Sequence, residues 1–191
     1  RVQSNIDELK SLSRRKRGIK EEKSEALKMA EQDHEERRQM WEEAIRLFND
    51  NSQALYETPG KLVIDIGDSG YSYKVDIERS GSEGIDKMKI FCFDLALLQL
   101  QLERQDRIDF LIHDTLMFDA VDPRQRARAL ERADQVTKAV NSQYICTMNS
   151  DMIPRSDFSD EFDFDKSVRL TLTDATPAGS LLGIRFERPG K

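Results

Sequence analysis

The sequence has 191 residues, which is room for one domain, or for one domain with an appendage. Charged residues make up 35% and hydrophobic residues 38% of the chain, and no apolar run approaches the roughly 18 residues that a membrane span requires. The two cysteines, Cys92 and Cys146, both lie in apolar stretches. The composition therefore excludes a disulfide framework and indicates buried, reduced thiols in a cytoplasmic protein.

The first residues, Arg1 to Asn5, include neither an initiator Met nor an apolar signal segment, so we expect the chain to be part of a longer polypeptide. Charge is unevenly distributed. Residues 1–50 contain 12 basic and 12 acidic residues, so the net charge of -6 lies entirely in residues 51–191. We therefore expect a charged arm over residues 1–50 and a compact domain over residues 51–191.

The arm is predicted to be one long helix. Residues 4–48 contain no Pro and only one Gly, and strong helix formers dominate them. Their apolar residues are sparse, which is typical of an exposed helix that pairs with another helix and stays outside a globular core. Such a helix would reach about 70 Å. We expect one strand of an antiparallel coiled-coil arm, whose partner strand lies outside this chain.

A basic run within the arm allows two interpretations. It is either a patch that contacts DNA phosphates or a solvated helix face whose charge is balanced by glutamates one or two turns further on. The balancing glutamates favour the second interpretation. The residues of the run are Arg14, Arg15, Lys16 and Arg17.

A β-hairpin and a buried helix are predicted next. Residues 61–66 and 71–77 are rich in β-branched and aromatic residues and flank a Gly-bounded turn, the pattern of a hairpin. The segment from Ile85 to about Leu102, opened by Gly84, is apolar on most of its faces. It is therefore expected to be a buried helix.

The next segments predict a parallel crossover. The short apolar runs Ile108–His113 and Gln143–Met148 indicate two core strands, and Pro123 begins a helix that ends at about Val140. A strand, a helix and a strand at this spacing form a right-handed parallel unit.

Residues 168–173 and 181–186 are predicted to form a closing hairpin. The expected fold class is therefore α/β, with a parallel strand-helix-strand core and flanking β-hairpins.

Several segments of this predicted fold suit phosphate or metal binding. The small residues Ser80 to Gly84 precede the buried helix, where free N–H groups attract anions, although a plain N-cap has the same pattern. Asp114 follows the first core strand, where α/β sheets bind ligands and Mg²⁺, although a turn Asp is an equal alternative. Asp122 can cap the helix that follows it. Polar residues 147–150 end the second core strand at the same edge of the sheet.

This order of segments resembles the C-terminal half of an ABC-type ATPase head of the SMC/RecN class of coiled-coil ATPases. It is closest to a little-characterised C-terminal domain of bacterial SMC-like ATPases, a domain family of unknown function. The segments that carry the likeness are YETPGKLVIDIGDSGY, SGSEGIDKMKIF, IDFLIHD, DPRQRA and QYICTMNSDM. The resemblance covers the chain from about Phe48 and implies an ABC-type C-terminal lobe with a returning coiled-coil strand.

The resemblance also implies roles for individual residues. In the family, the ABC signature contacts the γ-phosphate of ATP held by the other subunit. Asp114 matches the Walker B Asp that holds Mg²⁺ through water, and Asp122 matches the D-loop Asp. Asn149 stands where the switch His is usual. The residues that match the signature are Ser80, Gly81, Ser82 and Glu83.

The chain departs from the ABC pattern at three positions. Ser82 replaces the second Gly of the signature. Thr115 stands where the catalytic Glu is expected, and Thr cannot act as a general base near neutral pH. Asn149 can hydrogen-bond a phosphate but cannot titrate. The loop from Asp114 to Asp122 is also one residue longer than the usual spacing. Asp119 and His113 are the candidates for the missing base. Without a base, we expect either slow hydrolysis or a role for ATP mainly as a dimerising ligand.

No Gly-x-x-x-x-Gly-Lys-Ser/Thr motif occurs in the sequence, so the phosphate-binding loop is expected to come from elsewhere. The partner implied is an N-terminal ATPase lobe, from the same native polypeptide. With that lobe and in a homodimer, the chain is expected to bind ATP and Mg²⁺. DNA and accessory proteins are further partners, in repair, maintenance or defence against foreign DNA, by family analogy alone.

Two other functions stay open at this stage. A metal-dependent nuclease or hydrolase would collect divalent ions on His113, Asp114, Asp119 and Asp122. A non-catalytic coiled-coil interaction module would dock a partner on the acidic-aromatic stretch 157–165. The alternative for that stretch is a solvated loop whose Phe side chains tuck against the domain.

Overall fold

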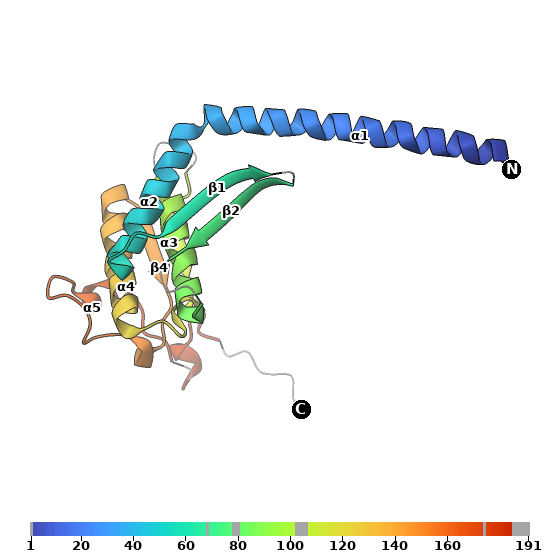
Figure 1. Ribbon diagram of the computed structural model, residues 1–191. Helices are drawn as coiled ribbons and strands as arrows, with labels where there is room; N and C mark the ends of the chain where they lie inside the picture. The colour runs from blue at the N-terminus through green and yellow to red at the C-terminus, as the bar shows by residue number, and fades with distance from the viewer. Residues whose placement is uncertain (1, 68, 78–80, 102–106, 174, 185–191) are drawn as a thin grey trace.

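The computed structural model describes residues 2–67, 69–77, 81–101, 107–173 and 175–184. In this part of the chain the fold is mixed α/β: a long helix projects from a domain of packed helices and two small sheets (Figure 1). No helix within these ranges has both the length and the hydrophobicity needed to cross a bilayer.

The expected single arm helix is divided at Arg37. Helix α1 spans Val2–Glu36 and helix α2 spans Arg38–Tyr56, with Arg37 at φ -97° and ψ 14° between them. The chain changes direction there, so α1, about 50 Å long, projects from the molecule while α2 turns into the domain (Figure 1). Neither Gly nor Pro stands at the break. It occurs just before the part of the helix that packs on the core, and the hairpin contacts both helices near the break.

Helix α2 is part of the core, which corrects the expectation that the arm helix stays outside it. The cause is its apolar stripe, whose spacing of three and four residues places one face of the helix against the domain. The boundary expected at residue 50 from composition lies inside this helix. The buried apolar residues of α2 are Ala44, Leu47, Phe48 and Leu55.

The predicted first hairpin is confirmed. Strand β1, Lys61–Gly67, pairs antiparallel with strand β2, Gly70–Asp76. Gly70 has a φ of 102°, a conformation that favours glycine. The hairpin extends alongside the base of the arm (Figure 1), where the Tyr71 hydroxyl donates a hydrogen bond to the Asp33 carboxylate at 3.1 Å.

Two predicted helices form the centre of the domain. Helix α3, Glu83–Leu100, is the expected buried helix, and helix α4, Pro123–Val140, has the bounds that the sequence predicts. Both pack against α2. Together the three helices enclose one core, whose members include Phe48, Met88, Phe91, Leu95, Ala129, Leu130 and Ala133.

The parallel strand-helix-strand unit is also confirmed. Strand β3, Phe110–His113, pairs parallel with strand β4, Gln143–Cys146, and α4 lies between them in the chain. The sequence predicts core strands, but among the described residues only one face of this sheet is covered. The other face carries Ile112 and Ile145, which are paired with each other and are 56% and 44% exposed. An apolar run indicates a strand that can be buried on both faces, but it does not supply the second covering layer.

The predicted closing hairpin does not form in the described part of the chain. Residues 168–173 and 181–184 are not strands there, and positions 185 and 186 of the expected second strand lie outside the described residues. The alternating pattern of residues 168–173 suits a strand, but in the part of the chain that the structure describes no strand lies beside it to exchange backbone hydrogen bonds. This region instead contains the short helices α5, Phe164–Ser167, and η3, Pro177–Gly179.

The acidic-aromatic stretch packs on its own domain. The ring of Phe158 stacks on that of Phe164 at 5.3 Å, and both rings contact the core. The backbone N–H of Ser159 donates to the Glu131 carboxylate of α4 at 2.6 Å. These Phe side chains are therefore used inside the domain, as the solvated-loop interpretation requires.

Both cysteines are free thiols, as predicted. Burial raises the pKa of the Cys92 thiol to about 12 and that of the Cys146 thiol to about 11. Both side chains are therefore protonated and poorly nucleophilic near neutral pH.

Candidate functional site

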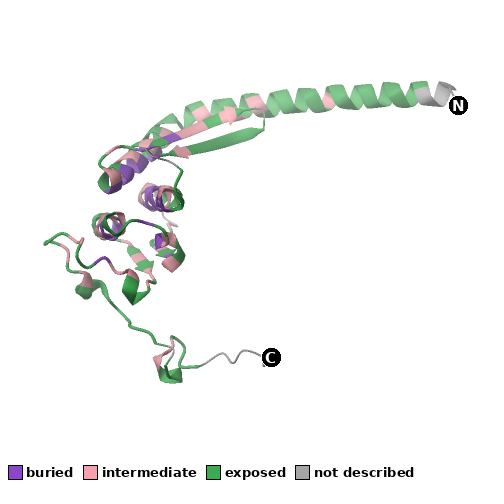
Figure 2. Cartoon of the chain, turned by 60° about the horizontal axis from the view of Figure 1, so that its bottom comes forward, coloured by how far each residue is buried: buried purple, intermediate pink, exposed green. Residues whose placement is uncertain are grey.

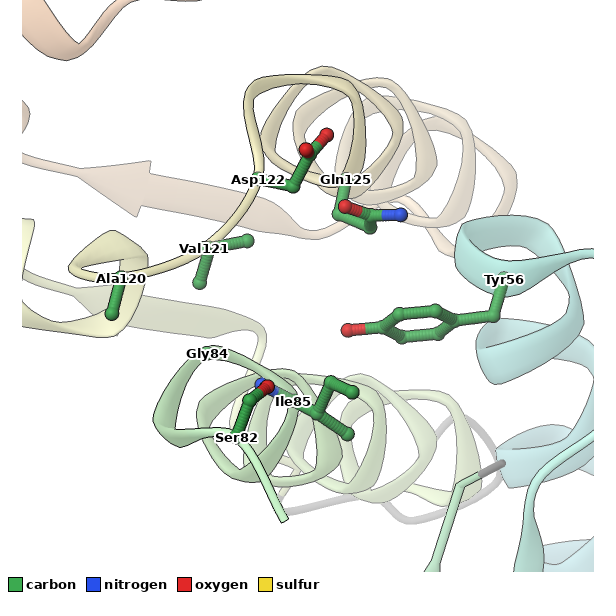
Figure 3. A pocket seen from close by; sticks show the side chains of 8 residues that line it. All are labelled: Tyr56, Ser82, Gly84, Ile85, Ala120, Val121, Asp122 and Gln125. Atoms are coloured by element: carbon green, nitrogen blue, oxygen red, sulfur yellow. The ribbon is translucent and has the colours of Figure 1, made fainter. Parts of the chain in front are cut away.

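A cleft of about 200 Å³ lies between the N-terminal ends of α3 and α4 and the C-terminal end of α2 (Figure 3). Three separate segments line it, so the site depends on the packing of all three helices. It brings together Ser82, one of the four residues compared with the ABC signature, and Asp122, the residue compared with the D-loop Asp. The lining residues are Tyr56, Ser82, Gly84, Ile85, Ala120, Val121, Asp122 and Gln125.

The start of α3 is built for close approach to the loop before α4. The Ser82 hydroxyl oxygen accepts the N–H of Ile85 at 3.3 Å and so caps the helix. A Cβ atom at Gly84 would collide with the carbonyl oxygen of Ala120, so only glycine lets these two segments touch. The first N–H groups of α3 have no acceptor within the helix and carry its partial positive charge to this end.

Lys87 ties α3 to the loop over residues 119–122. Its ammonium pairs with the Glu83 carboxylate at 2.9 Å and donates to the backbone carbonyl oxygen of Asp119 at 3.2 Å. At the other end of the loop, Asp122 accepts the N–H of Arg124 at 3.0 Å, which confirms that it caps α4. The two sides of the cleft are thus held in a fixed relation.

Tyr56 is a lining residue that sequence reasoning missed. Its ring extends from the end of α2 toward the space between α3 and α4 (Figure 3). Burial raises the pKa of the phenol, so the hydroxyl stays protonated and can donate a hydrogen bond to an anion. Gln125, in the first turn of α4, was missed as well. No motif marks either position, because only the helix packing brings them to the cleft.

The candidate Walker B residue Asp114 directly follows β3 and is exposed. Its Oδ1 accepts the N–H of Leu116 at 3.0 Å and caps the short helix η1, Thr115–Phe118. The turn interpretation of Asp114 is therefore correct, and it leaves room for a metal role, because a carboxylate offers about four acceptor positions. Asn149 follows β4 at the same edge of the sheet and is also exposed.

Thr115 has a structural role at this edge. Its hydroxyl donates to the backbone carbonyl oxygen of Thr147 at 3.1 Å, and the N–H of Thr147 donates to the carbonyl oxygen of His113 at the same distance. These two bonds join the chain after β3 to the chain after β4. The residue in the catalytic Glu position therefore fixes the edge that carries Asp114.

His113, one candidate for the missing base, is already fully hydrogen-bonded. Its Nε2 lies 3.0 Å from a carboxylate oxygen of Asp94 and its Nδ1 lies 3.1 Å from the Tyr144 hydroxyl. The Asp94 carboxylate accepts from Nε2–H, and Nδ1 is bonded to the Tyr144 hydroxyl. His113 is 7% exposed and could accept a substrate proton only if one of these bonds broke.

The remaining candidate residues lie in different places. Gly81, at φ 127°, and Glu83 flank the start of α3, whereas Ser80 lies outside the described residues. The carboxylate-bearing residue Asp119 is half-buried in the loop before α4. The basic run of the arm lies on the exposed surface of α1, far from the cleft in sequence: Arg14, Arg15, Lys16 and Arg17.

Within the described ranges, no three His, Cys, Asp or Glu side chains are grouped to hold a metal ion. A Mg²⁺ ion that arrives with a nucleotide needs only one or two protein carboxylates, because phosphate oxygens and water supply its other ligands. Asp114 fits that requirement as a single exposed carboxylate at a strand end.

Residues 51–186 match a family described as an uncharacterised protein conserved in bacteria (DUF2326). No curated protein matches the chain. The chain belongs to this bacterial family.

Proposed function

We propose that the chain is the C-terminal half of an SMC/RecN-like ABC ATPase head. In this proposal it supplies the signature motif, the Walker B Asp and the D-loop to an ATP site that two subunits share. The phosphate-binding loop comes from an N-terminal lobe of the same native polypeptide. The whole head then works in the cytoplasm as a homodimer held together by ATP.

The observation that carries the proposal is the cleft itself. Ser82 belongs to the segment that resembles the signature and Asp122 matches the D-loop Asp, and these residues are distant in sequence but line one cleft. The N-terminus of α3 faces this cleft beside the protonated Tyr56 hydroxyl, an arrangement that favours a negatively charged group. A terminal phosphate of ATP has the charge and the acceptor oxygens for this position.

The side chains around Asp114 are suited to ATP binding, but they do not place a general base for rapid ATP hydrolysis. Thr115 donates its hydroxyl to Thr147 and His113 is engaged on both ring nitrogens, so neither is positioned as a base. Asp119 is left as the only base among the candidates considered. We therefore expect ATP to act chiefly as a dimerising ligand that is hydrolysed slowly.

A role in DNA repair, DNA maintenance or defence against foreign DNA rests on the family resemblance alone. The exposed run Arg14–Arg17 offers a phosphate-binding patch for such a role. A DNA-binding assay over a range of salt concentrations would test it, with these four residues replaced by Gln in the comparison protein.

The test of the ATP site uses the native polypeptide that contains both lobes, with dimerisation measured by light scattering with and without ATP and Mg²⁺. Ser82→Asp keeps a good N-cap but places a negative charge in the cleft, and Ser82→Asn keeps the cap without the charge. We expect Ser82→Asp to weaken ATP-dependent dimerisation by about 10-fold or more, because it repels the phosphate. Ser82→Asn should dimerise like the native protein.

The matching test of the strand edge is Asp114→Asn, measured as Mg²⁺-dependent ATP hydrolysis. It removes the negative charge and keeps an oxygen that can accept the Leu116 N–H. We expect the rate of Mg²⁺-dependent ATP hydrolysis to fall, while the fold stays unchanged. Equal dimerisation by Ser82→Asp and Ser82→Asn, together with native hydrolysis by Asp114→Asn, would overturn the proposed function.

A further inference from the structure

His113 is a buried polar residue at the end of β3, where the chain passes to Asp114. Among the described residues of β3 and β4 it is the only buried one, and the rest of the two strands is exposed or half-buried (Figure 2). An apolar side chain could fill this position and would leave no polar group to satisfy. A buried imidazole is costly unless its ring nitrogens have hydrogen-bond partners, so the contacts of His113 call for an explanation.

The hydrogen-bond partners of His113 come from two other elements. Nε2 lies 3.0 Å from a carboxylate oxygen of Asp94, about three turns into α3, and Nδ1 lies 3.1 Å from the Tyr144 hydroxyl on β4. The Phe91 ring of α3 packs beside both, 5.6 Å from the imidazole and 6.0 Å from the Tyr144 ring. We call Asp94, His113 and Tyr144 the polar row. It joins α3, β3 and β4 on the core side of the sheet.

The polar row holds the backbone from which Asp114 projects. Asp114 is extended, with φ -96° and ψ 176°, so its side chain and that of His113 point to opposite faces. The His113 carbonyl oxygen accepts the N–H of Thr147, and the Thr115 hydroxyl donates to the carbonyl oxygen of Thr147. Asp114 therefore lies between two residues that are each bonded to a neighbouring segment.

The Asp114 carboxylate is held in one orientation with one oxygen left over. Its Oδ1 accepts the N–H of Leu116 at 3.0 Å, whereas Oδ2 makes no hydrogen bond or ion pair with the residues that the structure describes. Mg²⁺ demands nearly ideal octahedral geometry, and a misplacement of about 1 Å in a site can reduce its activity about 100-fold. A single carboxylate that binds Mg²⁺ must therefore be oriented accurately by the fold.

The polar row contributes orientation more than stability. Its hydrogen bonds replace bonds to water, so each contributes a net stabilisation of only about 0.5–1.5 kcal/mol. A buried polar network in which every member is bonded is nevertheless rigid and specifies one arrangement, because any shift would leave polar groups unsatisfied. These properties are those of a device that fixes the position of the chain around Asp114.

We infer that Asp94, His113 and Tyr144 are positioning residues that orient Asp114 for Mg²⁺. They act by locking the end of β3 to α3 and to β4, and none of them contacts the ion. The inference rests on the proposed function for the role of Asp114 as the Mg²⁺ ligand. The row itself follows from the distances and burial of the described residues.

The first experiment uses the 191-residue chain without nucleotide or metal. Asp94→Ala removes the acceptor of Nε2–H, and Asp94→Asn keeps an oxygen that can accept it. We expect the Thr147 amide, which is bonded to the His113 carbonyl oxygen, to exchange with solvent about 10-fold faster in Asp94→Ala and at the native rate in Asp94→Asn. Asp134→Ala on α4 is the matched control, because Asp134 is similarly exposed (26% against 29% for Asp94) and pairs with Lys138. It should leave this exchange unchanged.

The second experiment measures ATP hydrolysis by the native two-lobe polypeptide and separates its Mg²⁺ requirement from its ATP requirement. We expect the half-saturating Mg²⁺ concentration to rise about 10-fold in Asp94→Ala and in Tyr144→Phe. The half-saturating ATP concentration should stay within about 2-fold of the native value, because the row does not touch the cleft residues. Asp94→Asn should restore the native Mg²⁺ requirement. A row with only a structural role would instead change both requirements together, in proportion to the loss of stability in urea.

Two results would overturn the inference. Native exchange of the Thr147 amide in Asp94→Ala would show that the row does not hold the end of β3. A native Mg²⁺ requirement in Asp94→Ala and Tyr144→Phe would show that the row does not orient Asp114. The exchange experiment contains neither ATP nor Mg²⁺, whereas failure of the proposed function appears as native hydrolysis by Asp114→Asn, so the two failures are distinguishable.

Discussion

At the scale of single residues, the packing of the three helices depends on one buried polar side chain. Asn51 of α2 is 0% exposed. Its amide nitrogen donates to the carbonyl oxygen of Cys92 at 3.3 Å and to the side-chain oxygen of Gln99 at 3.0 Å, both on α3. Its Oδ1 accepts from Arg132 of α4 at 2.9 Å. One residue therefore holds α3 and α4 in register with the helix that carries Tyr56 to the cleft.

Replacement of this side chain should be costly. Asn51→Ala leaves the buried carbonyl of Cys92 and the part-buried side chains of Gln99 and Arg132 without these hydrogen bonds, and each unsatisfied buried group costs about 1–3 kcal/mol. We expect the free energy of unfolding to fall by about 2–4 kcal/mol in urea titrations followed by circular dichroism. Gln53→Ala, an exposed position two residues further along α2, should change it by less than about 0.5 kcal/mol. Equal effects of the two changes would show that the network contributes little.

Replacement of Gly by Ala should have opposite effects on stability at Gly84 and at Gly18. Gly84→Ala forces α3 away from Ala120, and overpacking of this kind costs about 1–3 kcal/mol. Gly18 lies within α1 with no atom near the position of an added Cβ, so Gly18→Ala should favour that helix by about 0.5–1 kcal/mol. Urea unfolding measures the first effect and helical ellipticity the second. A stable Gly84→Ala protein would mean that the loop before α4 moves freely from α3.

At the scale of elements, the hairpin supports the base of the arm. The Tyr71 ring lies 6.3 Å from that of His34 on α1 and 6.1 Å from that of Trp41 on α2, so it contacts both sides of the break at Arg37. The Tyr71 hydroxyl also donates to Asp33. The Arg37 guanidinium beside Asp33 holds the pKa of this carboxyl below its usual value, so the acceptor is ionised at neutral pH.

This junction can be followed selectively, because Trp41 is the only tryptophan in the sequence. Tyr71→Ala should shift Trp41 emission to longer wavelength and increase its quenching by acrylamide, since the hairpin no longer shields the indole. The unfolding midpoint of the domain should change little. Tyr73→Ala removes a 55% exposed ring from the same strand and serves as the control. Identical spectra for the two variants would place the hairpin away from the junction in solution.

Elements whose pattern is local were predictable from the sequence, and those that depend on neighbouring layers were not. Helix α4 has a Pro start and a full apolar stripe, and the first hairpin has a Gly-bounded turn, so both agree with their predicted ranges. Residues 168–173 have an equally clear strand pattern, yet a strand forms only beside another strand. For the same reason, the pattern of Ile112 and Ile145 predicts burial, whereas both side chains are exposed among the described residues.

The candidate site was predictable only in part, for a similar reason. Ser82, Asp114 and Asp122 stand at ends of elements, where sequence patterns are most informative, and all three act as caps there. Tyr56 reaches the cleft because α2 extends beyond the expected end of the arm helix. That extension results from tertiary packing of Asn51 and Leu55, both of which are 0% exposed. A local sequence pattern therefore does not predict that α2 extends to Tyr56.

At the scale of the whole molecule, the composition of the chain changes near residue 50, but the structural boundary between arm and domain lies elsewhere. The charge pattern separates residues 1–50 from the rest, but the core already includes Ala44, Leu47 and Phe48. Helix α1, in contrast, has no buried residue among those whose burial is described, residues 6–36. The physical boundary between arm and domain is therefore the break at Arg37, where α1 leaves and α2 enters the core.

Two truncated chains distinguish these boundaries. The fragment 51–191 loses Ala44, Leu47 and Phe48, and the removal of a buried Leu and a buried Phe side chain costs roughly 5–10 kcal/mol. That is comparable to the whole stability of a typical domain, about 5–15 kcal/mol, so we expect no cooperative thermal transition and strong binding of a hydrophobic dye. The fragment 38–191 keeps all of α2 and should melt within a few degrees of the full chain. Cooperative melting of fragment 51–191 at the temperature of the full chain would instead place the boundary at the composition change and remove α2 from the core.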